Sequence, residues 1–280
     1  MNWNTIVSAK ELSQHLSDTG LVLVDARFAL ANALAGEQAW HAMHLPNASY
    51  VHLDRDLSDK QKPTRFGRHP LPDADQFCRT LMRCGISPES QVVVYDTNDG
   101  AMAAARFWYL LRLLGHEKVA VLNGGFAHWL ESGLPVDNKI PHIRPSIYHA
   151  EYDPSQLVSA ETVSANISEN KFVLIDARAA ERYRGEVEPI DKLAGHIPKA
   201  LNHPFSLNLD NDRFRSAEEL KQDFQALLDG RLASDAIFYC GSGVTACHNL
   251  LAMEFAGLHG ARIFSPSWSG WISDPDHTIE

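Results

Sequence analysis

Cysteine and glycine are combined at residues 237–246 in a way that can stabilise a sulfur anion. The run "IFYCGSGVTA" leads three apolar residues directly into Cys240, and Gly241 and Gly243 follow. A helical pattern begins at about Thr245, so the free N–H groups and the positive dipole end of a helix face back towards the sulfur. The two glycines allow the loop to curl with its N–H groups inward. The pattern therefore predicts a nucleophilic thiolate held by backbone donors.

A nucleophile in this place needs a strand that ends at it and a helix that starts behind it. Apolar runs at 21–24, 92–95 and 118–122 lack the alternation of half-exposed strands, and a strong helical pattern covers 101–115. Such strands, interleaved with helices, predict an α/β fold with a parallel sheet covered by helices on both faces. Ligands of these sheets bind beyond the carboxyl ends of the strands, where we expect Cys240 to lie.

The chain contains two copies of one pattern. Residues 7–27 align without a gap with residues 158–178, and each copy ends on the triplet Asp-Ala-Arg. Further along, "HLPNA" at 44–48 matches "HIPKA" at 196–200. Matches that recur in the same order indicate a duplicated fold, so we expect two tandem domains of the same architecture.

The boundary between the copies is visible as a change in composition. Residues 138–154 contain three prolines and follow neither a helical nor a strand period, which is typical of an extended linker. We therefore predict an N-terminal domain at 1–138, a linker at 139–154 and a C-terminal domain at 155–280.

Composition argues against several classes of protein. The net charge of −10, from 25 basic and 35 acidic residues, disfavours a nucleic-acid partner, which would need a basic face. No secretory signal and no membrane-spanning run is visible, so we expect a cytoplasmic protein without a membrane partner. No Cys or His pair has zinc spacing backed by a second pair, so no metal is expected. The four cysteines are expected to be reduced, and all except Cys240 to serve packing: Cys78, Cys84 and Cys247.

The motifs together resemble the tandem rhodanese family over essentially the whole chain. They are "CGSGVTA" at 240–246, "GHIPKA" at 195–200 and "SWSGW" at 267–271. Among family members, the chain is most similar to the 3-mercaptopyruvate sulfurtransferases, whose active loop reads Cys-Gly-Ser-Gly-Val-Thr. Thiosulfate-preferring members carry two cationic residues where this chain has Gly241 and Ser242.

The resemblance implies a sulfurtransferase that needs no cofactor. Cys240 would take a sulfane sulfur from 3-mercaptopyruvate as a persulfide and pass it to cyanide, a small thiol or thioredoxin, with ping-pong kinetics. One alternative is a thiosulfate:cyanide sulfurtransferase. A second alternative, from another class, is a non-enzymatic sulfur carrier or sensor.

The resemblance also implies which residues bind the substrate. Arg182 matches an arginine that grips the substrate carboxylate, which suits the forked guanidinium group; the alternative is a surface salt bridge with Glu181 or Glu186. The family's second arginine falls at Ile190, where Lys192 is a candidate replacement. The loop residues expected to surround the substrate are Gly241, Gly243, Val244 and Thr245.

A histidine relay is the third implication of the resemblance. His44 matches a histidine that acts with the loop serine, here Ser242, but Asn32 stands near the position of the acid. An amide orients an imidazole without stabilising its cation as a carboxylate does. The alternative is that His44 is a turn residue, like its repeat partner His196.

The first copy lacks the nucleophile. It has Asp96 where the second copy has Cys240, and the following "TNDGAMAA" lacks the glycine pattern. We therefore expect a non-catalytic N-terminal domain without the matching glycine cradle, in which Asp96 caps a turn or the next helix.

Overall fold

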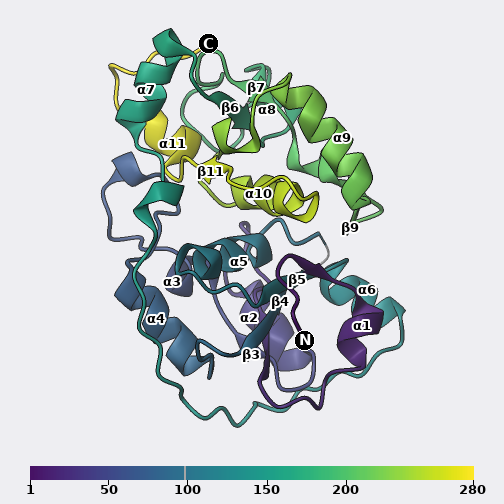
Figure 1. Ribbon diagram of the computed structural model, residues 1–280. Coiled ribbons are helices and arrows are strands. Elements are labelled where there is room, and N and C mark those ends of the chain that lie inside the picture. Colours follow the sequence, from purple (N-terminus) through teal and green to yellow (C-terminus); the bar gives the residue numbers. More distant parts are fainter. Residues whose placement is uncertain (98) are drawn as a thin grey trace. The chain divides into compact units, whose positions relative to one another are not determined.

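The computed structural model describes residues 1–97 and 99–280, which form two compact units (Figure 1). Unit 1 consists of Met1–Asp59, Pro72–Asp153 and Asn211–Phe214. Unit 2 consists of Lys60–Leu71, Pro154–Asp210 and Arg215–Glu280. Each unit thus includes a short segment from the other half of the sequence. The predicted division into 1–138, 139–154 and 155–280 follows the order of the sequence and does not include this exchange.

Unit 1 is built on a five-stranded sheet whose strands all pair in parallel, in the order β1-β5-β4-β2-β3. The strands are β1 (Ile6–Val7), β2 (Leu21–Asp25), β3 (Ser49–Tyr50), β4 (Gln91–Tyr95) and β5 (Val119–Leu122). The helices of the same unit are α1 (Ala9–Ser13), α2 (Ala35–Ala42), α3 (Leu53–Asp56), α4 (Ala74–Arg83), α5 (Ala104–Leu113) and α6 (Gly125–Glu131).

Unit 2 repeats this architecture. Its parallel sheet has the order β11-β10-β6-β7, and a parallel bridge from Leu157 to Ile263 lies where β1 pairs with β5 in unit 1. The strands are β6 (Val173–Asp176), β7 (Leu201–Asn202), β10 (Ala236–Tyr239) and β11 (Arg262–Ile263). The helices are α7 (Ala160–Glu169), α8 (Ala180–Tyr183), α9 (Ala217–Leu228), α10 (Ala246–Phe255) and α11 (Ser267–Trp271).

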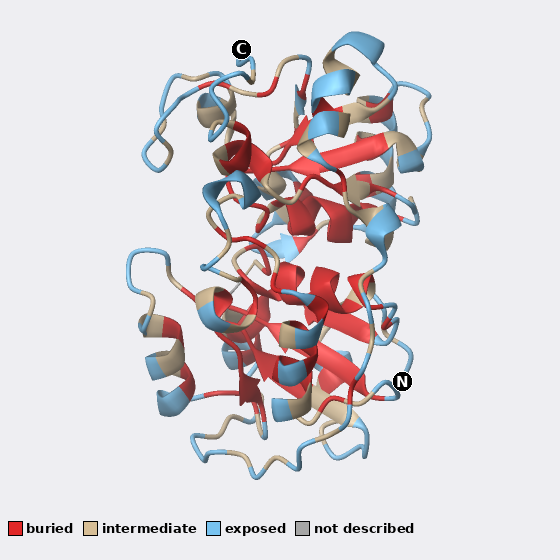
Figure 2. Cartoon of the chain, turned by 90° about the vertical axis from the view of Figure 1, so that its left-hand side faces the viewer, coloured by how far each residue is buried: buried red, intermediate tan, exposed pale blue. Residues whose placement is uncertain are grey.

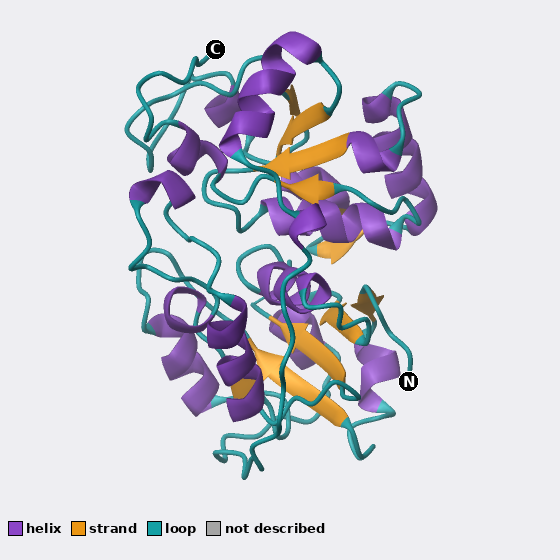
Figure 3. Cartoon of the chain, turned by 60° about the vertical axis from the view of Figure 1, so that its left-hand side comes forward, coloured by secondary structure: helices purple, strands orange, loops and turns teal. Residues whose placement is uncertain are grey.

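The remaining elements are short. They are the 3-10 turns η1 (Thr64–Phe66), η2 (Pro154–Gln156), η3 (Phe205–Asn208) and η4 (Ala233–Asp235), and the strands β8 (Leu209–Asp210) and β9 (Arg213–Phe214). In each unit, helices flank the strands (Figure 3), and the central strands are buried (Figure 2). The predicted α/β fold with two similar parallel sheets is confirmed. No helix within the described part of the chain is long and apolar enough to cross a bilayer.

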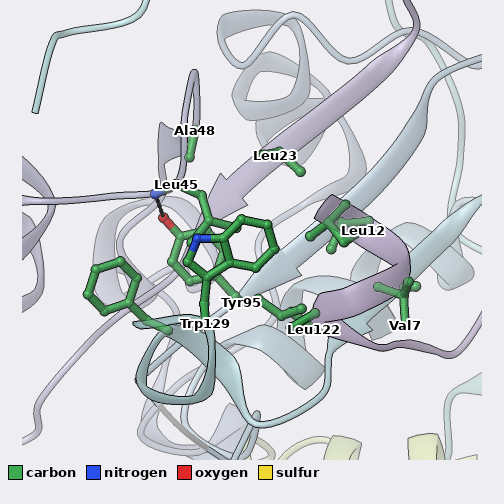
Figure 4. Close-up of a cluster of buried hydrophobic side chains, with 12 residues drawn as sticks. Val7, Leu12, Leu23, Leu45, Ala48, Tyr95, Leu122 and Trp129 are labelled. Carbon is green, nitrogen blue, oxygen red and sulfur yellow. Dashed lines mark hydrogen bonds between the residues drawn. The ribbon is translucent and has the colours of Figure 1, made fainter. Parts of the chain in front are cut away.

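A buried tyrosine fixes the end of the central strand in both units. In unit 1, Tyr95 lies in a core that includes Leu12, Leu23 and Trp129, and its hydroxyl accepts a hydrogen bond from Leu45 N at 3.1 Å (Figure 4). In unit 2, the hydroxyl of Tyr239 accepts from Ile197 N at 3.2 Å. Because a polar tip deep in a core needs a partner, these bonds set the depth of the strand. They place the next residue, Asp96 or Cys240, at the carboxyl edge of its sheet.

The two Asp-Ala-Arg triplets each form a buried ion pair. Arg27 Nη2 lies 2.6 Å from Asp25 Oδ2, and Arg178 Nη2 lies 2.6 Å from Asp176 Oδ2. Both carboxylates are fully buried, and an ion pair with several charge-assisted hydrogen bonds is the form in which buried charge is tolerated.

Candidate active site

Cys240 directly follows β10 and precedes the helix α10, as the sequence predicts. Its side chain is almost fully buried, with the residue 1% exposed. The Gly243 N–H donates to Cys240 Sγ at 3.1 Å, so a backbone dipole is directed at the sulfur. Gly243 has a φ of 78°, a left-handed conformation in which a side chain would be strained. This glycine therefore allows the loop to turn its N–H inward, towards the sulfur.

The segment around α11 holds the main chain of the loop. Cys240 N donates to Ser267 Oγ at 3.1 Å, and the same hydroxyl lies 3.1 Å from Phe264 O, to which it donates. Trp268 N donates to Cys240 O and Ser269 N donates to Gly241 O, each at 2.9 Å. The main chain of the active loop is thus anchored on both sides of the cysteine.

The other cysteines have the packing role that the sequence predicts. Cys247 is buried in α10, and its thiol donates to Gly243 O at 3.4 Å. Burial raises the pKa of Cys84 to about 11 and also raises the pKa of Cys78, so both resist forming thiolates. All four cysteines are thiols rather than disulfides. Val244 is buried and Thr245 is the N-cap residue of α10; their contact with substrate stays a prediction.

Arg182 belongs to a network of ion pairs beside the active loop. Its Nη2 lies 2.7 Å from Glu188 Oε1 and 3.3 Å from Asp191 Oδ2, whereas Glu186 pairs with Arg184 instead. A Cβ atom at Gly241 would lie 3.5 Å and 3.7 Å from the Nη2 and Nη1 atoms of Arg182. The guanidinium group therefore faces the active loop, where the sequence predicts a carboxylate-binding arginine.

Arginine and backbone donors hold Glu188 in its ionised form. Burial alone would raise the pKa of Glu188, but hydrogen bonds from Arg182 and from the N–H groups of Asp191 and Ile190 outweigh it and lower the pKa. Glu188 also contacts Arg178 at 3.3 Å. Arg182 is thus fixed in orientation by charge-assisted bonds rather than being free on the surface.

Arg68 is a site residue that sequence reasoning missed. A Cβ atom at Gly241 would lie 3.1 Å from Arg68 Nη2, while Arg68 Nη1 donates to Asp191 Oδ1. The residue belongs to Lys60–Leu71, the segment that unit 2 takes from the first half of the sequence. Arg68 thus places a second cation beside the loop, in addition to Arg182; the replacement of the family's second arginine by Lys192 stays a prediction. In the sequence, the dipeptide Arg-His within "FGRHPLP" is the feature that could have indicated a polar site residue here.

His69 replaces His44 as the partner of Ser242, which corrects the sequence-based assignment. The Nδ1 atom of His69 lies 2.9 Å from Ser242 Oγ. In His44, by contrast, Nδ1 is hydrogen-bonded to the main-chain oxygen of Trp40 at 2.7 Å, and Nε2 to that of Lys139 at 3.2 Å. The first of these bonds matches the bond from His196 Nδ1 to Tyr183 O, at 2.8 Å.

His44 therefore has a structural role like its repeat partner, the alternative that the sequence left open, and it lies in an antiparallel bridge with Asp137 just before a turn. The amide of Asn32, proposed near the acid position, accepts a local bond from Leu34 N at 3.2 Å. Both ring nitrogens of His44 are occupied by carbonyl groups of unit 1, which leaves its imidazole with a structural role.

Asp96 caps the start of a helix in unit 1, as predicted, and it does so by filling a cradle of backbone N–H groups. Asp96 accepts from the N–H groups of Gly100 at 2.9 Å, of Met102 at 3.2 Å, and of Ala103 and Ala104 at 3.3 Å each. The side chain thus caps α5, which begins at Ala104 rather than at 101. Asn98 of this loop lies outside the described residues. Among the described residues, no group of three or more His, Cys, Asp or Glu could hold a metal ion.

Both halves of the chain match one family model. The description of that family is Rhodanese-like domain, and the matched residues are 8–132 and 159–274. These ranges contain Asp96 and Cys240 at the ends of their central strands.

Relatives match along nearly the full length. A probable 3-mercaptopyruvate sulfurtransferase of Pseudomonas aeruginosa is 44% identical over 98% of this chain and 97% of the relative. A thiosulfate sulfurtransferase of Gallus gallus is 33% identical, over 95% of this chain and 93% of its own. Among solved structures, a 3-mercaptopyruvate sulfotransferase of Escherichia coli superposes with a TM-score of 0.81 at 29% identity, covering 95% of this chain and 99% of that one.

Proposed function

This chain belongs to the rhodanese family, and from that premise we propose that it is a 3-mercaptopyruvate sulfurtransferase with Cys240 as the sulfur carrier. One observation carries the proposal. A buried cysteine receives the Gly243 N–H on its sulfur, while two guanidinium groups face the neighbouring Gly241. A thiolate beside a carboxylate-binding group matches a donor that has both a sulfur atom and a carboxylate.

The first half-reaction breaks a carbon–sulfur bond. The Cys240 thiolate attacks the sulfur of 3-mercaptopyruvate and forms a sulfur–sulfur bond, and the electron pair of the broken bond leaves with carbon as the enolate of pyruvate. The enolate takes a proton and departs as pyruvate. The enzyme then holds a persulfide, and no external oxidant or reductant is used.

His69 and Ser242 can supply the proton that the enolate needs. Their contact at 2.9 Å is within the range for proton transfer between a hydroxyl and an imidazole. We assign Ser242 as the group that delivers the proton and His69 as the group that replaces it. Thiosulfate releases sulfite, which leaves without a proton, so this pair serves the carbon leaving group specifically.

The second half-reaction transfers the outer sulfur to a nucleophile. An acceptor thiolate, such as a small thiol or reduced thioredoxin, or cyanide, attacks the outer sulfur and releases the Cys240 thiolate. No cofactor takes part in either step. The net charge of −10 supports a small-molecule role without nucleic acid or membrane, and reduced cysteines fit a cytoplasmic location.

Unit 1 has no part in the chemistry under this proposal. Asp96 occupies the position of the nucleophile and cannot carry sulfur, and its carboxylate already fills the cradle at the start of α5. We therefore assign the covalent step to unit 2 alone.

Kinetics with two donors on one preparation test the proposal. We expect parallel-line, ping-pong kinetics and a higher kcat/KM with 3-mercaptopyruvate than with thiosulfate. Thiosulfate is the relevant second donor, because one of the relatives is a thiosulfate sulfurtransferase. A preference for thiosulfate would make the chain a thiosulfate:cyanide sulfurtransferase, and no turnover of either donor would leave a sulfur-carrier or sensor role.

A further inference from the structure

Two guanidinium groups converge on the residue next to the nucleophile. A Cβ atom at Gly241 would lie 3.1 Å from Arg68 Nη2 and 3.5 Å from Arg182 Nη2. The φ of Gly241 is not among the positive values of the chain, so its backbone does not require glycine. The missing side chain instead leaves room for the two arginines to approach the loop.

Asp191 holds the two arginines together. Its Oδ1 accepts from Arg68 Nη1, and its Oδ2 lies 3.3 Å from Arg182 Nη2. The Asp191 side chain is only 4% exposed, and its own N–H donates to Glu188 Oε1 at 3.0 Å. One buried carboxylate thus bridges both cations and reduces their mutual repulsion. Besides Arg182 Nη2, which pairs with Asp191, the guanidinium nitrogen atoms nearest to the loop are Arg68 Nη2 and Arg182 Nη1.

The charges of this cluster balance. Arg68, Arg178 and Arg182 face the carboxylates of Asp176, Glu188 and Asp191. An anion would therefore be drawn to the loop by directed N–H groups more than by excess positive charge. Two donors from two planar groups suit the two oxygens of a carboxylate, which arginine binds with defined geometry.

Arg68 is fixed by its main chain and is still accessible. Its N–H donates to Ser269 Oγ at 3.0 Å, and Ser269 N in turn donates to Gly241 O at 2.9 Å. The Lys60 ammonium donates to Arg68 O at 2.8 Å. Ser269 therefore ties Arg68 directly to the active loop. The Arg68 side chain is 30% exposed and lines a cavity of about 570 Å³ within unit 2.

We propose that Arg68 is a specificity-determining residue that, together with Arg182, clamps the carboxylate of the sulfur donor above the active loop. The proposal rests on the proposed function, because it assigns a role in binding that donor. It predicts that the donor's carboxylate lies between Arg68 Nη2 and Arg182 Nη1, with its sulfur directed at Cys240.

The test uses the full chain with Arg68→Ala and Arg68→Lys. Arg65→Ala is the matched control, since Arg65 lies in the same segment, is exposed, and stacks on the ring of Phe66 at 4.9 Å. For Arg68→Ala we expect KM for 3-mercaptopyruvate to rise by about tenfold to a hundredfold, with a smaller change in kcat. Arg68→Lys should recover part of the loss, because lysine restores the charge but not the fork.

Two results would overturn the clamp. One is that Arg68→Ala behaves like Arg65→Ala; the other is that it loses equal efficiency with 3-mercaptopyruvate and with thiosulfate, which has no carboxylate. Thermal unfolding of each variant shows whether it is folded. If Arg68→Ala does not fold, Arg68→Lys decides: a raised KM for 3-mercaptopyruvate alone supports the clamp, and unchanged kinetics overturn it.

Binding of pyruvate separates this inference from the proposed function. Pyruvate carries the same carboxylate without the sulfur, and its dissociation constant can be measured by ligand-observed nuclear magnetic resonance without turnover. Weaker binding by Arg68→Ala than by Arg65→Ala supports the clamp even if the wild type fails to use 3-mercaptopyruvate. Equal binding by the two variants, or no binding by the wild type, overturns it.

Discussion

The Nδ1 atom of His69 lies 2.9 Å from the hydroxyl oxygen of Ser242, although 173 positions separate the two residues in the sequence. Both belong to unit 2, because the segment Lys60–Leu71 is part of that unit. The contact joins an imidazole to the loop that carries the nucleophile, and it is the basis of the proton-transfer step.

Replacing His69 should affect the two donors differently. We expect His69→Ala to lower kcat with 3-mercaptopyruvate by about 10²–10⁴-fold, the usual contribution of general acid–base catalysis. Turnover of thiosulfate should fall much less, since sulfite leaves without a proton. Steady-state kinetics with both donors measure this, and an equal loss with both would assign His69 a structural role.

His44→Gln provides the contrast. The imidazole of His44 is hydrogen-bonded to two carbonyl groups in unit 1. We therefore expect the variant to have a lower unfolding temperature and, once folded, an almost unchanged kcat. A selective loss of 3-mercaptopyruvate turnover in this variant would restore His44 to the relay.

The part of the site that the sequence predicts is the part encoded locally. Cys240 and Gly243 follow a strand and precede a helix within one short run, so composition and periodicity are enough to place them. The paired Asp25 and Arg27 are two positions apart and were equally accessible to prediction.

Arg68 and His69 were missed for a physical reason. They lie in a proline-flanked segment without a periodic pattern, and their importance arises only because this segment packs with the second sequence half. His44 was considered because the family resemblance matched it to a relay histidine, whereas its repeat partner His196 supported the alternative of a turn residue. The structural role of His44 rests on its hydrogen bonds to main-chain carbonyls. No sequence pattern indicates these bonds.

Arg182→Ala should weaken the use of 3-mercaptopyruvate. Loss of a charge-assisted bond of about 1.5–3 kcal/mol predicts a drop in kcat/KM of roughly tenfold to a hundredfold. The matched control is Arg184→Ala, because Arg184 makes an exposed pair with Glu186 and should leave kinetics unchanged. Equal losses with 3-mercaptopyruvate and thiosulfate would indicate that Arg182 acts on the loop in general and not on a carboxylate.

Asp96 should make the stability of the protein depend on pH. Burial raises the pKa of Asp96 from 3.8 to about 6, with a further contribution from Asp99 and a partial offset by backbone N–H groups. The folded state therefore holds the proton more tightly than the unfolded chain. Its stabilising effect is complete below about pH 4 and is lost as pH rises through about 6, a change on the order of 3 kcal/mol.

Comparison with Asp96→Asn isolates this titration, since asparagine has no proton to lose. We expect the free energy of unfolding of the wild type to fall relative to the variant between about pH 4 and pH 6.5, and then to level off. Carbon-13 resonances of the Asp96 carboxyl group give the midpoint directly. A constant difference between the two proteins across this range would contradict the assignment.

Cys247→Ser should keep most of the transferase activity. The hydroxyl can still donate to Gly243 O, as the thiol does at 3.4 Å, and we assign Cys247 no sulfur-carrying step. Assays of a folded variant with a thiol acceptor check this. Inactivation specific to the second half-reaction would identify Cys247 as a resolving thiol.

The central claim is that Cys240 carries the sulfur as a persulfide, and intact-protein mass spectrometry tests it most directly. We predict that incubation with 3-mercaptopyruvate, without acceptor, adds the mass of one sulfur atom, that peptide mapping places it on Cys240, and that a thiol acceptor removes it. Cys240→Ser should show no gain and no turnover, while Cys247→Ser should gain the sulfur as the wild type does. A persulfide on another cysteine, or turnover by Cys240→Ser, would contradict the account.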